Sequence, residues 1–106
     1  MTACVVITTC ASETEASAIA RHLVEQHLAA CVQFVPIQSI YRWQGDVYQE
    51  PEVQLMIKTR AALFGAIERE IRTLHSYEEP EIIVLPIQQG SASYLAWIGA
   101  QTGAEG

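Results

Sequence analysis

Residues 31–60 read CVQFVPIQSIYRWQGDVYQEPEVQLMIKTR and contain two long strand-like runs. The first run, 31–43, is rich in β-branched and aromatic residues, which fit a pleated and half-buried surface. The second run, 47–59, alternates apolar and polar residues in its second half, the period of a strand with one solvated face. Gly45 lies between the runs and supplies the positive φ that a tight turn needs. The segment therefore predicts one long β-hairpin.

The predicted hairpin is longer than the domain that could cover it. A strand of this length spans about 40 Å at roughly 3.3 Å per residue, whereas a domain of about 100 residues is only about 34 Å across. Pro36 and Pro51 lie nearly opposite each other, and because proline cannot donate to a ladder, they mark where the hairpin leaves the domain. The outer half carries Ile40, Tyr41 and Trp43. Since an isolated two-stranded ribbon is marginal in water, we expect other copies of the chain to cover it.

The residues before the hairpin predict a strand and a helix. Residues 3–9, ACVVITT, form the short apolar run that is typical of a buried strand. Ser12, followed three residues later by Glu15, is a capping box and opens a helix that continues to about His27. The apolar stripe of this helix is formed by Ala16, Ile19, Ala20 and Leu23.

The residues after the hairpin predict a second helix, a strand and a short last helix. Residues 60–74 are amphipathic, and 81–87 form a second apolar run of the buried-strand type. Ser91 is a candidate N-cap for a helix over 94–98 that Gly99 ends. The apolar face of the 60–74 helix consists of Leu63, Ile67, Ile71 and Leu74.

The predicted order is β-α-β-β-α-β followed by a short C-terminal helix, the α+β arrangement called ferredoxin-like. Right-handed crossovers place both main helices on one face of a four-stranded sheet. The usual strand order, 4-1-3-2, puts the 31–43 strand at an edge, where Pro36 is tolerated. We expect a single domain over residues 1–100 and a flexible tail over 101–106.

Composition limits the function classes. Half of the residues are apolar and 17% are charged, as in soluble globular proteins, and the net charge of −6 disfavours nucleic acids and anionic membranes as partners. The three cysteines form no C-x-x-C pair and the N-terminus has no signal-peptide pattern, so a cytoplasmic protein with reduced thiols is expected. The sequence carries no nucleophile, Walker or dinucleotide motif, and we do not expect an enzyme.

The densest candidate site is the segment 75–81, HSYEEPE. An imidazole and three carboxylates within it are suited to a divalent cation, since His binds copper and zinc and carboxylates bind harder ions. A structural interpretation is also open, because a cation at His75 would stabilise the end of the preceding helix and the glutamates would solvate a loop. Tyr41 and Trp43 are likewise either a binding platform or side chains buried against a neighbouring subunit.

The sequence resembles the CutA family of divalent-cation tolerance proteins. The resemblance is carried by short stretches throughout the chain, namely AACV at 29–32, SIYRWQG at 39–45, IKT at 57–59, H-x-Y-x-x-P-E-I-I at 75–83, LPI at 85–87 and YLxWI at 94–98. It implies a ferredoxin-like homotrimer whose 31–60 hairpins pair between subunits, with a role in divalent-metal tolerance and no established catalytic reaction.

The resemblance also implies a metal site. Family members proposed to bind copper use a His pair and a cysteine at the end of the first strand. His75 matches one member of the pair, Leu74 occupies the place of the other, and Cys10 lies at or one residue past the cysteine position. The candidate ligands for copper or another divalent cation are therefore His75 and Cys10. The alternative function is a regulatory module, similar in shape to the trimeric PII signalling proteins, that binds a small ligand or a partner protein at clefts between subunits.

Overall fold

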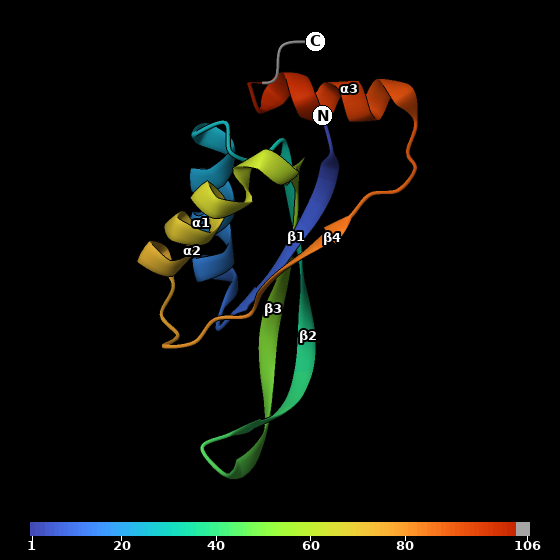
Figure 1. Ribbon diagram of the computed structural model, residues 1–106. Helices are drawn as coiled ribbons and strands as arrows, with labels where there is room; N and C mark the ends of the chain where they lie inside the picture. The colour runs from blue at the N-terminus through green and yellow to red at the C-terminus, as the bar shows by residue number, and fades with distance from the viewer. Residues whose placement is uncertain (104–106) are drawn as a thin grey trace.

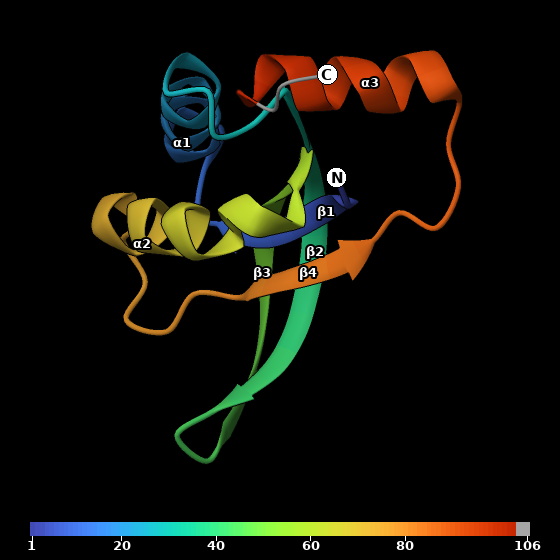
Figure 2. The same ribbon diagram turned by 45° about the horizontal axis from the view of Figure 1, so that its top comes forward.

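The computed structural model describes residues 1–103 and has the predicted ferredoxin-like topology (Figure 1). Its elements are β1 (Ala3–Cys10), α1 (Glu13–Glu25), β2 (Cys31–Trp43), β3 (Asp46–Arg60), a 3₁₀ turn (Ala61–Leu63), α2 (Phe64–Leu74), β4 (Ile82–Pro86) and α3 (Ala92–Gln101). The four strands form one antiparallel sheet in the order β2-β3-β1-β4. Helices α1 and α2 cover one face of the sheet, and α3 crosses its end (Figures 1 and 2).

The main core lies between the sheet and the helices α1 and α2. The stripe predicted for α1 is fully or almost fully buried, and so are Ile67 and Ile71 of α2. They pack against the alternate residues of β1 and β3 that point to this face, among them Val6, Leu55 and Ile57. Leu74 does not join them, and its side chain is 41% exposed because α2 ends at this residue, beyond the packed part of its stripe. Among the helices of residues 1–103, none has the length and apolar character needed to cross a membrane.

The hairpin has the predicted length and projects from the domain. Gln44 and Gly45 both have positive φ, 51° and 90°, and form a two-residue turn that pairs Trp43 with Asp46. Strand β1 pairs with β3 only as far as Val53, so the part of the hairpin beyond it has no neighbouring strand within the described chain. The molecule is consequently elongated, with dimensions of 48 × 25 × 21 Å.

Strand β4 departs from the sequence prediction of a buried strand. It pairs with β1 on one side only, and it forms the second edge of the sheet. Three consecutive side chains, Ile83, Val84 and Leu85, are 46%, 41% and 48% exposed. The apolar run predicts a strand buried on both faces, but an edge strand in a single chain lacks the neighbour that would provide this cover.

Helix α3 is longer than predicted at both ends. The Ser91 hydroxyl accepts a hydrogen bond from the Tyr94 amide, as expected of an N-cap, but Gly99 lies inside the helix and is buried. The Arg60 guanidinium donates to the carbonyl of Thr102 at 3.0 Å and so satisfies the C-terminal end of the helix. Thr102 is 3% exposed, so the first residues of the expected 101–106 tail belong to the folded domain. Residues 104–106 lie outside the described part of the chain.

Candidate functional site

His75 ends α2 and connects two parts of the chain through both of its ring nitrogens. The Tyr77 amide donates to Nδ1 at 3.0 Å, so Nδ1 is the acceptor and the proton resides on Nε2. Nε2 then donates to the carbonyl of Thr9, at 2.6 Å, near the end of β1. The side chain is completely buried, with 0% of its surface exposed. His75 is thus a neutral, fully hydrogen-bonded bridge between β1 and the loop 75–81.

Glu15 of α1 holds the same loop from the other side. Its carboxylate accepts hydrogen bonds from the Ser76 amide at 2.8 Å, the Ser76 hydroxyl at 3.1 Å and the Ala11 amide at 3.2 Å. Burial raises the pKa of Glu15, but the hydrogen bonds from Ser76 and Ala11 outweigh it, and the pKa is lowered. The Ser12 hydroxyl accepts from the Glu15 amide, as the capping box predicts. The Glu15 carboxylate, however, contacts the Ala11 amide and connects α1 to the loop.

Cys10, the other candidate ligand, is the last residue of β1 and is completely buried. Its thiol donates to the carbonyl of Ser12 at 3.5 Å. Burial raises the pKa of Cys10, and the charges of Glu15 and Glu52 raise it further, against the lowering effect of the Ser12 contact. Since the thiolate is the form that binds metals, this environment opposes the role that the resemblance implies.

Within one chain, His75 and Cys10 are not available to chelate a metal ion. His75 has no free lone pair, because Nδ1 accepts one hydrogen bond and Nε2 carries the proton that it donates. Cys10 is held as a buried thiol. Over the part of the chain that the structure describes, no group of three or more His, Cys, Asp or Glu side chains is arranged to hold a metal. A copper or zinc site needs three or four ligands, so the geometry does not favour His75 and Cys10 as such a site.

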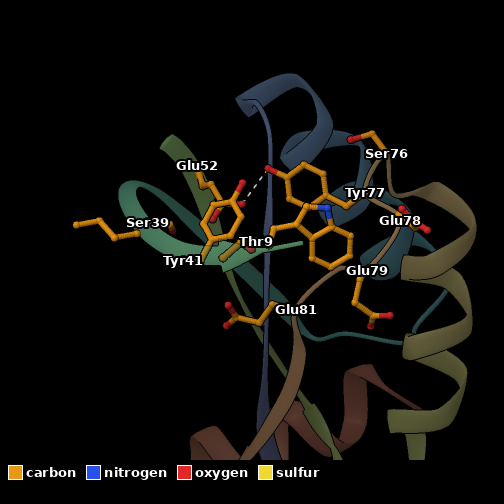
Figure 3. Close-up of a pocket in the computed structure, with 11 residues that line it drawn as sticks. Thr9, Ser39, Tyr41, Glu52, Ser76, Tyr77, Glu78, Glu79 and Glu81 are labelled. Atoms are coloured by element: carbon orange, nitrogen blue, oxygen red, sulfur yellow. Dashed lines mark hydrogen bonds between the residues drawn. The ribbon is translucent and has the colours of Figure 1, made fainter. Parts of the chain in front are cut away.

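A cleft of about 620 Å³ lies beside this network, between the outer part of the hairpin and the loop 75–81 (Figure 3). It combines aromatic and acidic side chains that are far apart in the sequence. The aromatic lining consists of Tyr41, Trp43 and Tyr77, the acidic lining of Glu52, Glu78, Glu79 and Glu81, and the remaining lining of Thr9, Ser39, Ile40 and Ser76. The sequence pattern singles out Tyr41, Trp43 and the loop glutamates, but nothing in it indicates that they share one cavity.

Hydrogen bonds hold the two tyrosines of the cleft. The Tyr77 hydroxyl donates to Glu52 at 2.8 Å (Figure 3), and the Tyr77 ring packs on His75 with centroids 4.7 Å apart. Burial, followed by the bond to Glu52, raises the pKa of Tyr77. The Tyr41 hydroxyl donates to Glu50, which raises the pKa of Tyr41 to about 12. Both phenols therefore stay neutral at physiological pH and act as fixed walls of the cleft.

Comparisons with known proteins agree with this architecture. Residues 4–101 match the family described as CutA1 divalent ion tolerance protein. The chain is 46% identical over 100 residues to the divalent-cation tolerance protein CutA of Thermus thermophilus, covering 93% of this chain and 97% of that protein. It is 50% identical over 92 residues to the CutA homolog of Xenopus laevis, covering 86% of this chain but 61% of the relative. It spans about half, 51%, of the length of the mouse and human CutA proteins.

Solved structures show the same fold. CutA1 from Oryza sativa superposes with a TM-score of 0.94 at 36% identity, covering 99% of this chain and 97% of that one. The divalent cation tolerance protein from Thermus thermophilus superposes with a TM-score of 0.92 at 45% identity, covering 95% and 99%. With a family match over almost its whole length and close relatives by sequence and by structure, the chain belongs to the CutA1 family of divalent ion tolerance proteins.

Proposed function

We propose that this chain serves divalent-cation tolerance as a homotrimer whose hairpins pair between subunits, and that it catalyses no reaction. The observation that carries the proposal is the projecting hairpin, which extends beyond β1 without a neighbouring strand in the described chain. The printed names of its relatives in Thermus and Archaeoglobus supply the link to divalent cations. The resemblance to the CutA family supplies the number of subunits.

Both edges of the sheet support assembly. Strand β2 of the hairpin is one edge of the sheet and leaves Phe34 and Val35 40% exposed, and β4 is the opposite edge with its exposed apolar run. Exposed apolar edge strands pair with other chains unless they are protected. Contiguous exposed apolar surface of this kind marks an interface in soluble proteins. A second and third copy of the chain would cover both edges.

Sedimentation equilibrium at micromolar concentration tests the assembly. The expected mass is three times the 11.7 kDa of one chain. In a closed ring of three, β2 of one subunit would pair with β4 of the next and no edge would stay unpaired. A stable monomer or dimer at this concentration would contradict the proposal.

Copper is the ion that the resemblance implies, and we propose that it binds weakly, at the carboxylates of the cleft. Glu78 and Glu81 line the same cleft as Glu52, and none of the lining side chains within residues 1–103 is basic. Glu79 is partly neutralised, since Arg72 Nη2 lies 3.6 Å from its carboxylate. Carboxylates bind divalent cations through few direct contacts and retain water, which supports weak binding rather than chelation.

Isothermal titration calorimetry with copper sulfate distinguishes copper binding at the carboxylates from copper binding at His75. We expect the triple variant Glu78→Gln, Glu79→Gln, Glu81→Gln to weaken copper binding at least about fivefold, because it removes most of the charge that attracts the ion. The variant His75→Gln is expected to keep the affinity, because the ring nitrogens of His75 are already used within the fold. Loss of binding in His75→Gln, with retention in the triple variant, would return His75 to the role of ligand.

A second function is favoured by the aromatic walls of the cleft. Three aromatic side chains line this open cleft, which is a feature of small-molecule sites and is not needed to hold a hydrated ion. The cleft therefore supports a regulatory module that binds a small ligand. In a trimer the cleft lies on the hairpin that crosses to the neighbouring subunit, so that a ligand there would contact an element of the assembly.

A further inference from the structure

We propose that Tyr77 is a positioning residue for assembly: its hydrogen bond to Glu52 sets the direction in which the hairpin leaves the domain, and so prepares the hairpin for pairing with neighbouring subunits (Figures 1 and 3). The inference rests on the homotrimer proposed above and names a residue that prepares the single chain for it. Three observations carry it: the hairpin loses its neighbouring strand at Val53, Tyr77 reaches it at the next residue, and the loop that carries Tyr77 is fixed to the domain.

The support of the hairpin by β1 ends at a defined residue. Cys10 and Val53 form the last pair between β1 and β3, and Glu52 is the first residue of β3 beyond it. From Glu52 to the turn at Gly45 the strand runs about 23 Å at roughly 3.3 Å per residue. A tilt of about 10° at the base would therefore displace the turn by roughly 4 Å, which is close to the spacing of about 4.8 Å between paired strands. The direction at Glu52 thus decides which part of a neighbouring subunit the hairpin meets.

Tyr77 contacts the hairpin at this base. Its hydroxyl donates to the Glu52 carboxylate at 2.8 Å. Among the side-chain hydrogen bonds and ion pairs within residues 1–103, it is the only one that joins residues 37–52 to another part of the chain, because the others of this segment connect one part of the hairpin to another. Hydrogen bonds to a carboxylate are stronger than those between neutral groups. The direction of the hairpin in a single chain therefore depends on this contact.

The loop that carries Tyr77 is fixed to the domain on two sides. The Tyr77 amide donates to His75 Nδ1 at 3.0 Å, and the two rings pack with their centroids 4.7 Å apart. His75 is in turn bound to the carbonyl of Thr9 in β1. The Ser76 amide donates to the carboxylate of Glu15 in α1 at 2.8 Å. The Tyr77 hydroxyl consequently has a fixed position relative to the sheet and to α1.

A hairpin with a fixed direction favours association. Ordering a segment at the moment of binding costs free energy that is subtracted from the affinity. A hairpin that is already held in one direction avoids this cost, and in a symmetric trimer it does so in each of the three subunits. Tyr77 acts through Glu52 in this role and does not need to contact the neighbouring subunit itself.

Sedimentation of fluorescently labelled protein over a dilution series measures the dissociation constant of the trimer. We expect Tyr77→Phe to raise this constant about tenfold per subunit, or roughly a thousandfold for three symmetric copies. Glu52→Gln retains an oxygen that accepts from Tyr77, so its effect should not exceed about threefold per subunit. Glu52→Ala should have the full effect, and adding Tyr77→Phe to Glu52→Ala should change nothing further, because the hydrogen bond is already lost.

Two spin labels report the direction of the hairpin in single chains, through the distances measured by pulsed electron paramagnetic resonance. Asp46→Cys places one label at the turn and Ser17→Cys the other on α1, both at exposed positions. Cys31→Ser prevents labelling of the partly exposed native thiol, whereas the other two cysteines are buried. Leu85→Lys on the edge strand β4 supplies single chains, and Ile83→Lys on the same edge is added if that variant remains trimeric.

In these single chains we expect Tyr77→Phe to widen the distribution of distances between the labels at least about twofold, because tilts of about 10° at the base are no longer restrained. Tyr41→Phe is the matched control. It removes a hydroxyl that also donates to a glutamate, but its partner Glu50 lies in the same hairpin, so the width should stay unchanged. If Tyr77 only stabilised the fold, Tyr77→Phe would lower the free energy of unfolding and leave the width in folded chains unchanged.

Each outcome decides the proposal. Equal dissociation constants for Tyr77→Phe and the unmodified protein, or equal widths for Tyr77→Phe and Tyr41→Phe, would overturn it. A further loss when Tyr77→Phe is added to Glu52→Ala would also overturn it. Glu52→Ala removes the same hydrogen bond from the hairpin side, so it decides the question if Tyr77→Phe does not fold. An unmodified protein that is not a trimer would contradict the proposed assembly together with this role, whereas a trimer insensitive to Tyr77→Phe would contradict this role alone.

Discussion

Replacing His75 with alanine is expected to lower the free energy of unfolding by about 3 kcal/mol and the melting temperature by roughly 15 °C at a fixed protein concentration. The substitution removes a completely buried imidazole and leaves the Tyr77 amide and the Thr9 carbonyl without their partner. Each buried group left unsatisfied costs about 1–3 kcal/mol. If His75 acted only as a charge at the end of α2, the loss would be about 1 kcal/mol. Denaturant and thermal unfolding distinguish these values.

His22→Ala is the control for this prediction. His22 is 34% exposed and contacts Glu70 of α2 at 2.7 Å, so it connects two elements as His75 does but at the surface. Its removal is expected to cost no more than about 1 kcal/mol, the range for exposed pairs. Similar losses of unfolding free energy in the two variants would show that the His75 hydrogen bonds contribute little to stability. His75 would then again be a candidate for a role outside the fold.

Leu85→Lys is expected to dissociate the trimer. Leu85 lies on the edge strand β4 and is 48% exposed in the single chain. If a neighbouring subunit covers it, burial contributes about 2 kcal/mol per subunit, or roughly 6 kcal/mol over three symmetric copies. Loss of this association free energy would raise the dissociation constant of the trimer by roughly 10⁴-fold. Lysine would add the cost of burying a charged group at the interface. Sedimentation equilibrium should then give single chains at the concentration at which the unmodified protein is a trimer.

Val24→Lys provides the matched control. Val24 is 40% exposed, comparable with Leu85, but it lies on α1, on the helical side of the sheet. It should leave the mass unchanged, because the assembly proposed here uses the sheet edges and the hairpin. A trimer that survives Leu85→Lys but is lost in Val24→Lys would place the interface on the helical side.

Sequence patterns were sufficient wherever the determining interactions are local. The alternation in 31–60, the turn at Gly45 and the stripe of α1 predicted elements that the structure confirms, because strand period, positive φ and helix period are properties of short segments. The order of those elements, with the right-handed crossover rule, then determined the strand order. The predictions failed at Gly99 and in β4, where packing against distant residues decides whether a helix continues and whether a strand is covered.

Only the tertiary structure decided what His75 does and where the cleft lies. Along the chain His75 has the same neighbours whether it is a ligand or a helix cap, and its partner Thr9 is 66 residues away. Likewise, Tyr41 and Glu52 come from the hairpin and Tyr77 from the loop after α2, and they line one cavity because the hairpin extends past β1 toward that loop. Contacts between segments far apart in the chain depend on how the folded elements pack, and one-dimensional patterns do not encode that packing directly. The sequence thus determined the elements and their order, and the packing of those elements determined the candidate site.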